Sequence, residues 1–281
     1  MNTIKDPGSG YLQTKGAKLY YEVVGEGYPV VLVHAGVADH TMWDDQMEEF
    51  TRLYRVIRYD TRVFGKSVTE DVEFSNTDDL FELLKHIGVQ RAHLVGNSRG
   101  GTIALDFALE HPGMVSALVL VAAGLSGYRP PFEPTDTEKG LWEQEEVAWN
   151  AGDWEGVAAI DVQMWADGPG QPAGRAPESV RDRMRKMCLN TYNTHKVEGK
   201  EKPIDPPAAG RLDEVKVPTL VIHGDLDTSG TPNVSEKIAS GIKGAKKIVY
   251  PGVAHMVSME IPEEFNRVVL NFLAEVDRTR K

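Results

Sequence analysis

The amino-acid sequence predicts an α/β fold, with a mostly parallel, twisted sheet of eight strands between layers of helices. Two patterns in the 281 residues predict it. Short apolar runs rich in β-branched residues recur along the chain, as expected of strands buried on both faces. Segments with helical periodicity separate most of these runs, and this alternation is typical of a parallel sheet. At this length one large domain can hold the whole sheet.

The expected strands can be placed in order along the chain. Residues 11–16 and 18–24 flank a tight turn and are expected to pair antiparallel at one edge of the sheet. The parallel strands are expected at residues 30–33, 56–59, 93–95, 117–122, 219–222 and 247–250.

Two amphipathic segments illustrate the flanking helices. In residues 76–87 the apolar side chains fall on one stripe, with Asn76 as the expected N-cap. The last helix opens with Pro262 in its first turn and carries a second apolar stripe. Both helices are expected to pack against the sheet.

A long segment without strand signal interrupts the alternation. It spans residues 128–209, begins rich in proline and then turns polar and helical, which predicts a helical cap inserted into a core of residues 1–127 and 210–281. We expect its tryptophans mainly to hold the cap on the core. Trp165, together with Val37 and Met256, is expected to line the substrate pocket, because pockets are lined mainly by apolar groups.

Charge and cysteine content exclude several classes of function. The chain has 42 acidic and 31 basic residues, and its net charge of -11 would repel a nucleic-acid backbone. The start of the chain lacks the pattern of a signal peptide and no apolar stretch reaches membrane-spanning length, so the expected location is cytoplasmic, away from membranes. The single cysteine, Cys188, is expected to pack in the interior, which leaves no disulfide and no structural zinc.

Ser98 is the expected nucleophile. It stands in Gly96-Asn97-Ser98-Arg99-Gly100, after an expected strand and before an expected helix that ends near His111-Pro112-Gly113. A serine on such a tight strand-to-helix turn projects its hydroxyl at the end of the sheet, and the glycines avoid collisions there. The backbone N–H of Arg99, at the helix N-terminus, is then directed at a developing oxyanion.

A serine hydroxyl needs a neighbouring imidazole to take its proton, and that imidazole needs a carboxylate to orient it. His255 is expected to be the base, because it follows the last strand on a loop before the final helix. Asp225 and Asp227 both follow the strand at 219–222. We choose Asp227, which can lean toward the next loop, over Asp225, which is better placed to cap its own turn.

The remaining expectations concern the loop after residues 30–33 and the Arg99 side chain. The backbone N–H of Gly36 is the expected second oxyanion donor. A cation at a helix N-terminus opposes the helix dipole, so Arg99 is expected to pair with an acidic neighbour. Recognition of an anionic substrate by Arg99 is the alternative.

From about Gly16 to the C-terminal helix the chain resembles the α/β-hydrolase superfamily. The resemblance implies an α/β-hydrolase fold, with Ser98, Asp227 and His255 as catalytic triad and no cofactor. Ala35 and Val63 depart from glycines that are common in the family. The motifs that carry the resemblance are His34-Ala35-Gly36 with Trp43, Tyr59-Asp60-Thr61-Arg62 leading to Gly65 and Ser67, the Ser98 turn, Gly224-Asp225-Leu226-Asp227, and Gly252-Val253-Ala254-His255 with Glu260 and Pro262.

Within the superfamily the chain looks most similar to 3-oxoadipate enol-lactonase and carboxylesterase relatives, and Asp60 and Arg62 would be structural. Ser98 stands where dehalogenases and epoxide hydrolases carry aspartate, which argues against those two activities. The expected function is hydrolysis of a small ester or lactone through an acyl-enzyme on Ser98. The alternatives are carbon–carbon bond hydrolysis of ring-cleavage products, cofactor-free haloperoxidase or perhydrolase activity, and ligand binding without catalysis. The sequence leaves substrate and oligomeric state open.

Overall fold

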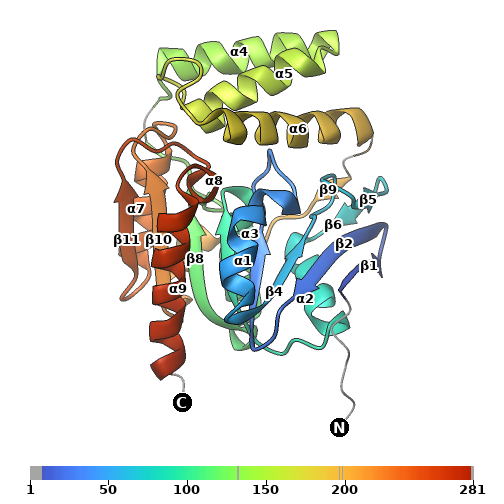
Figure 1. The fold of residues 1–281 in the computed structure, drawn as a ribbon, viewed down its shortest axis with the longest axis vertical. Coiled ribbons are helices and arrows are strands. Elements are labelled where there is room, and N and C mark those ends of the chain that lie inside the picture. The colour runs from blue at the N-terminus through green and yellow to red at the C-terminus, as the bar shows by residue number, and fades with distance from the viewer. Residues whose placement is uncertain (1–7, 132, 196, 198, 280–281) are drawn as a thin grey trace.

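The computed structural model describes residues 8–131, 133–195, 197 and 199–279 (Figure 1). Residues 1–7, on which the expectation about a signal peptide rests, lie outside the described residues. The main sheet has the strand order β1-β2-β4-β3-β7-β8-β10-β11, with the two-residue β5 (Val68–Thr69) paired to β2. The eight strands are β1 (Ser9–Thr14), β2 (Ala17–Val24), β3 (Tyr28–Val33), β4 (Tyr54–Tyr59), β7 (Ala92–Asn97), β8 (Val115–Val121), β10 (Thr219–Gly224) and β11 (Lys246–Tyr250).

The strand directions agree with the sequence-based expectation. β1 pairs antiparallel with β2, and β2 pairs antiparallel with β4. Every pairing from β4 through β3, β7, β8 and β10 to β11 is parallel. The predicted parallel sheet with an antiparallel edge is therefore confirmed. Its parallel strands are apolar because helices cover both faces.

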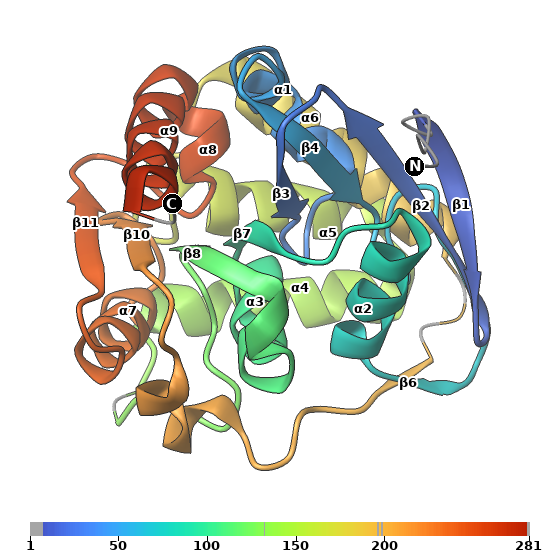
Figure 2. The same ribbon diagram turned by 90° about the horizontal axis from the view of Figure 1, so that it is seen from below.

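Figure 2 shows the helices in two layers, one on each face of the sheet. Each layer encloses its own apolar core against the sheet. One layer consists of α1 (Asp44–Thr51), α8 (Val257–Glu260) and α9 (Pro262–Thr279), and the other of α2 (Asn76–His86), α3 (Arg99–Glu110) and α7 (Thr231–Gly241).

The N-cap predicted for α2 is wrong by one residue. Ser75 has extended backbone angles, and its hydroxyl accepts a hydrogen bond from the N–H of Asp78, so Ser75 is the cap. Asn76 is the first helical residue, and its amide oxygen accepts a hydrogen bond from Arg99 instead.

A third group of helices lies across the carboxyl ends of the parallel strands (Figure 1). It consists of α4 (Asp136–Ala151), α5 (Trp154–Asp161), a π-helix (Val162–Asp167) and α6 (Glu178–Thr194). We refer to these four elements as the helical layer. We refer to the main sheet and the helices on its two faces as the sheet domain. Arg175 fastens the helical layer to the sheet domain, because its guanidinium donates to the carbonyls of Ala166 and Gly252 and pairs with Glu260.

The segment 128–209 is not wholly free of strands. β9 (Lys200–Glu201) pairs with β6 (Glu73–Phe74), and this two-stranded ribbon joins the end of the segment to the sheet domain. Strands of two residues are too short to leave an apolar pattern in the sequence. The division into a core and an inserted cap remains a prediction.

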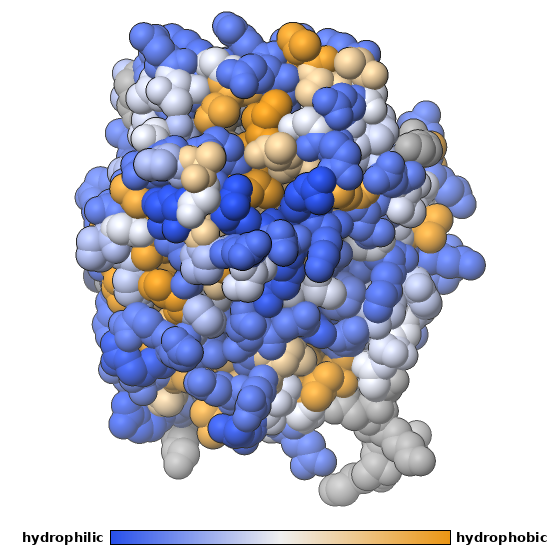
Figure 3. Space-filling view, turned by 45° about the horizontal axis from the view of Figure 1, so that its top comes forward, coloured by the Kyte–Doolittle hydropathy of each residue, from blue (hydrophilic) through white to orange (hydrophobic). Residues whose placement is uncertain are grey.

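Apolar surface gathers on the upper part of the molecule in Figure 3, where the helical layer lies. Trp142, Val147 and Trp149 are among the exposed large apolar side chains. Among the described residues, no helix is both long and apolar enough to cross a membrane. The expected cytoplasmic location remains a prediction.

Candidate active site

Ser98 occupies a strained turn between β7 and α3. Its φ of 52° and ψ of -118° lie where non-glycine residues are rare, a conformation that costs on the order of 1–3 kcal/mol. The N–H of Ser98 donates to the carbonyl oxygen of Val121 at 2.7 Å, which fixes the turn against β8. A Cβ at Gly96 would lie 2.2 Å from the carbonyl oxygen of Gly100, and a Cβ at Gly100 would lie 2.1 Å from that of Val33. Glycine is therefore required on both sides of Ser98.

His255 and Asp227 form a buried pair at the same end of the sheet. The Nδ1 atom of His255 lies 2.7 Å from Oδ2 of Asp227, and the two residues are 4% and 9% exposed. The other carboxylate oxygen, Oδ1, accepts the N–H of Thr228 at 2.6 Å. A carboxylate at this distance favours the tautomer with hydrogen on Nδ1, which leaves Nε2 able to accept a proton.

The two aspartates after β10 have different partners. Asp225 is exposed, and its Oδ1 accepts the N–H of Gly252 at 2.7 Å, so it caps the turn before His255. Of these two aspartates, only Asp227 contacts the imidazole of His255. The structure thus separates the aspartates in the way that the sequence analysis expected, and the catalytic role of Asp227 remains a proposal.

Gly36 lies beside the residue that follows Ser98. A Cβ built on Gly36 would lie 3.6 Å from Cβ of Arg99, in ordinary van der Waals contact. The loop after β3 and the N-terminus of α3 therefore meet next to Ser98. Two backbone segments that meet beside a nucleophile are the usual source of oxyanion-hole N–H groups.

The Arg99 side chain has an acidic partner, as expected. Its guanidinium donates to Oγ1 of Thr61 at 2.7 Å and to Asn76 at 3.2 Å, and it lies 3.4 Å from Glu201 on β9. It also lies over the ring of Phe64, 5.2 Å from the centroid. The ion pair with Glu201 is partly exposed, so it contributes at most about 1 kcal/mol.

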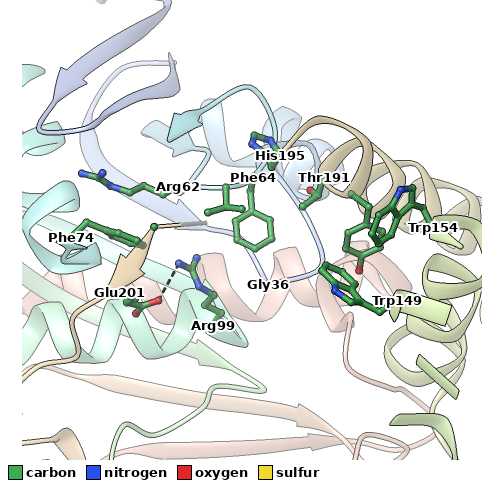
Figure 4. Close-up of a pocket in the computed structure, with 13 residues that line it drawn as sticks. Gly36, Arg62, Phe64, Phe74, Arg99, Trp149, Trp154, Thr191, His195 and Glu201 are labelled. Carbon is green, nitrogen blue, oxygen red and sulfur yellow. Dashed lines mark hydrogen bonds and ion pairs between the residues drawn. The ribbon is translucent and has the colours of Figure 1, made fainter. Parts of the chain in front are cut away.

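A cavity of 560 Å³ opens between the sheet domain and the helical layer (Figure 4). Gly36 and Arg99 reach it from the sheet domain, while aromatic side chains of α4, α5 and α6 reach it from the other side. The volume suits a small organic ligand. The lining residues are Gly36, Arg62, Val63, Phe64, Phe74, Arg99, Trp149, Trp154, Thr191, Tyr192, His195, Gly199 and Glu201.

The three residues predicted to line the pocket lie next to the site, and none belongs to the lining of this cavity. Val37 follows Gly36 and its carbonyl oxygen faces Cys188 at 3.4 Å. The Trp165 ring packs on the His255 ring, with centroids 4.7 Å apart. Met256 is fully buried. Their contact with substrate remains a prediction.

Sequence reasoning missed His195 and Glu201 as cavity residues. His195 is at the end of α6, and burial lowers its pKa, while its Nε2 lies 3.3 Å from the carbonyl oxygen of Gly65. Both residues reach the cavity from the stretch of chain that returns to the sheet domain after α6, and no local sequence motif marks them. Glu201 comes near Arg99 through the short pairing between β9 and β6, two strands that lie far apart in the sequence.

Two other histidines at strand ends, His34 and His223, are buried. His34 accepts the N–H of Thr61 on Nε2 at 3.0 Å, and burial lowers its pKa. Burial likewise lowers the pKa of His223. Cys188 is buried, and burial raises the pKa of its thiol, which agrees with a packing role.

The charged residues expected to be structural are bonded within the protein. Asp60 accepts the N–H and Nδ1 of His40 at 2.7 and 2.8 Å, and Arg62 pairs with the buried Asp79 at 2.6 Å. Val63 has a φ of 75°, a strained angle for a β-branched residue at a position where the family commonly has glycine.

Of the described residues, Asp39, His40 and Asp60 are the ones whose ligand atoms lie close enough to hold a metal ion. Oδ1 of Asp39 accepts the N–H of Thr41 at 2.8 Å, and Asp60 is bonded to His40 as above. Hydrogen bonds within the protein therefore already use these carboxylates.

Comparison with known proteins gives a consistent result. The family model for the alpha/beta hydrolase fold matches residues 28–262. A relative from Metapseudomonas resinovorans named 2-hydroxy-6-oxo-6-(2'-aminophenyl)hexa-2,4-dienoic acid hydrolase is 28% identical, covering 96% of this chain and 92% of its own length. A solved hydrolase from Pseudomonas aeruginosa PA01 is 26% identical with a TM-score of 0.73, covering 96% of this chain and 99% of that one.

A second solved structure, of an N-acyl homoserine lactone degrading enzyme, is 25% identical with a TM-score of 0.72, and the match covers 94% of this chain and 100% of that one. The family match spans the strands from β3 to β11, the Ser98 turn and the loops that carry Asp227 and His255. The expected α/β-hydrolase fold is confirmed, and the protein belongs to the α/β-hydrolase family of enzymes.

Proposed function

We propose that the protein is a serine hydrolase that cleaves a small ester or lactone through an acyl-enzyme on Ser98. One observation carries the proposal: a buried His255–Asp227 pair, 2.7 Å apart, at the sheet end where Ser98 occupies a strained turn. Strained backbone and buried polar pairs are costly, and they occur together where catalysis requires them.

The proposed reaction assigns a step to each group. Nε2 of His255 takes the proton of Ser98 as its oxygen attacks the carbonyl carbon, and Asp227 stabilises the imidazolium. The backbone N–H groups of Gly36 and Arg99 hold the oxyanion. The imidazolium then protonates the leaving alkoxide, and water, activated by the same imidazole, releases the acid and restores Ser98.

A panel of esters and lactones, graded by acyl length and charge, tests this function with wild type and Ser98→Ala. We expect measurable turnover in wild type and a loss on the order of a thousandfold or more in the variant, as removal of a triad member usually causes. Equal rates in the two proteins would contradict the proposal. Circular dichroism shows whether the variant is folded.

Carbon–carbon bond hydrolysis is the second candidate, and two observations favour it. The relative from Metapseudomonas resinovorans is named for a dienoic acid substrate. A dienoic acid carries a carboxylate, and the Arg99 guanidinium lines the cavity with Glu201 as a partly exposed ion-pair partner. A substrate carboxylate can replace Glu201 there, because such a pair is weak.

Ring-cleavage dienoates and neutral esters separate the two candidates. If carbon–carbon hydrolysis is the function, wild type consumes the dienoate with a higher kcat/KM than any ester, and Arg99→Gln raises KM for the dienoate but not for a neutral ester. If ester or lactone hydrolysis is the function, the dienoate remains unconsumed. The loss of absorbance of the conjugated dienoate measures its consumption directly.

A further inference from the structure

Asp161 is a buried carboxylate of the helical layer that takes no part in the proposed chemistry. It is the last residue of α5, directly before the π-helix, and is 2% exposed. Burying a carboxylate is unfavourable unless its oxygens accept hydrogen bonds. The hydrogen-bond partners of Asp161 therefore show which side chains this buried carboxylate holds in place.

Both oxygens of Asp161 accept hydrogen bonds from aromatic side chains. Nε1 of Trp165 donates to Oδ1 at 3.2 Å, and the hydroxyl of Tyr192 donates to Oδ2. Trp165 lies on the π-helix and Tyr192 on α6, so one carboxylate joins two elements of the helical layer. Single-turn π segments occur often at functional sites, because they redirect side chains.

Each arm of this cluster ends at the candidate active site. The Trp165 ring packs against the His255 ring, with centroids 4.7 Å apart and planes at 49°. Tyr192 lines the 560 Å³ cavity and contacts Trp149, with ring centroids 5.6 Å apart.

We propose that Asp161 is a positioning residue, which holds Trp165 against His255. This inference rests on the proposed function, because it assigns Asp161 a role only in a site where His255 acts. Trp165, held by its hydrogen bond to Asp161, limits the orientations of the His255 ring. The Nδ1 atom of that ring is fixed by Asp227. Small displacements of such groups have large effects on rate.

The electrostatic surroundings of Asp161 agree with this role. Burial raises its pKa to about 6, Glu145 on α4 adds to the rise, and the hydrogen bonds from Tyr192 and Trp165 oppose it. The pKa of Tyr192 is itself raised by burial, so its hydroxyl remains a protonated donor at neutral pH. Above pH 7 the carboxylate is ionised and can only accept hydrogen bonds, which is the state that the geometry requires.

The rate at which a fluorophosphonate labels Ser98, measured at pH 8, tests the proposal without knowledge of the substrate. We expect Asp161→Ala to slow labelling on the order of tenfold, the scale of coupling between contacting residues. Asp161→Asn should restore most of the rate, because its amide oxygen still accepts from Trp165. Glu155→Gln is the matched control: Glu155 joins the same helices, α5 and α6, through an exposed pair with Arg185 and touches none of the cluster, so labelling should stay at the wild-type rate.

A double mutant distinguishes positioning from general damage. If Asp161 acts through Trp165, the rate of Asp161→Ala combined with Trp165→Phe is close to that of the slower single variant. A wild-type rate in folded Asp161→Ala, or effects that multiply in the double mutant, would overturn the proposal. Should Asp161→Ala not fold, Trp165→Phe, which keeps an aromatic ring but loses the indole N–H, decides: slower labelling supports the proposal and a wild-type rate overturns it. If Ser98 of wild type is not labelled at all, the proposed function itself fails, and the role of Asp161 fails with it.

Discussion

The Ser98 turn and the helical layer above it are held in place by different means. Around Ser98 the backbone itself is close-packed: Gly96 and Gly100 have no room for a Cβ, and the serine has a strained φ. In the helical layer the fixed points are side chains, such as the pair of hydrogen bonds to Asp161. Local sequence can specify the first kind of structure, whereas the second depends on partners far apart in the chain.

The same contrast applies to the glycines. Gly140, in the second turn of α4, has open space where a Cβ would stand, while Gly100 would place a Cβ 2.1 Å from a backbone oxygen. One glycine is a requirement of the turn, and the other only weakens a helix. The difference indicates that the position of Gly140 tolerates a side chain, whereas the position of Gly100 does not.

The largest expected effect concerns Asp227. Asp227→Asn keeps the shape of the side chain but can no longer favour the His255 tautomer with hydrogen on Nδ1, so we expect kcat to fall by roughly a thousandfold to ten-thousandfold. Steady-state kinetics on an ester found in the panel measures it. Asp225→Asn, two residues away and exposed, should keep kcat within about threefold, since a neutral acceptor still satisfies Gly252. A similar loss in both variants would remove the distinction between the two aspartates.

A pair of glycine substitutions tests the structural contrast. Gly100→Ala should lower the free energy of unfolding by about 3 kcal/mol or more, because the methyl group collides with the carbonyl of Val33, which cannot move without disturbing β3. Gly140→Ala should raise it by about 0.4–1 kcal/mol through the loss of unfolded-state freedom. Urea denaturation of both variants measures the two effects. Equal destabilisation by the two substitutions would show that the surroundings of Gly140 are as tightly constrained as those of Gly100.

A smaller effect than that of Gly100→Ala is expected at Asp106 of α3, where stability should depend on pH. Burial raises its pKa to about 6, although the hydroxyl of Ser126 donates to it at 2.8 Å. Because the folded state binds this proton more tightly than the unfolded chain, the stabilisation is present below pH 4 and is lost as the pH rises through 6. Asp106→Asn should therefore raise stability by on the order of 2 kcal/mol at pH 7 and change little at pH 4.

Denaturation curves for Asp106→Asn and wild type at the two pH values provide the measurement. A gain that is the same at both would assign the effect to packing and not to the charge. Turnover should be unchanged, because Asp106 lies on α3 beyond the Ser98 turn. A stabilising substitution here would thus leave the site intact, in contrast to Asp161 in the helical layer.

The contrast between the regions also explains what the sequence could predict. The positions of the strands and of Ser98, Asp227 and His255 follow from apolar runs and loop motifs that are each only a few residues long. The structure brings His255 and Asp227 into contact. The N-cap at Ser75 was missed because two neighbouring residues, Ser75 and Asn76, both suit a cap. Backbone angles decided between them.

The cavity walls were beyond sequence reasoning for a physical reason. Glu201 reaches Arg99 only because β9 pairs with β6, and those strands are two residues long and more than 120 positions apart in the chain. Trp149 and Tyr192 become walls only when α4 and α6 pack together. Trp165 was chosen for the pocket on its apolar character alone, whereas its contacts with His255 and Asp161 arise only from the packing of the folded chain.

The central claim is that Ser98 is an activated nucleophile, and peptide mapping after reaction with a fluorophosphonate tests it most directly. We expect one stable adduct on the peptide that contains Ser98, none in Ser98→Ala, and strongly slowed formation in Asp227→Asn. A folded wild-type protein in which Ser98 stays unmodified would contradict the claim, and would indicate a protein that holds its ligand without cleaving it.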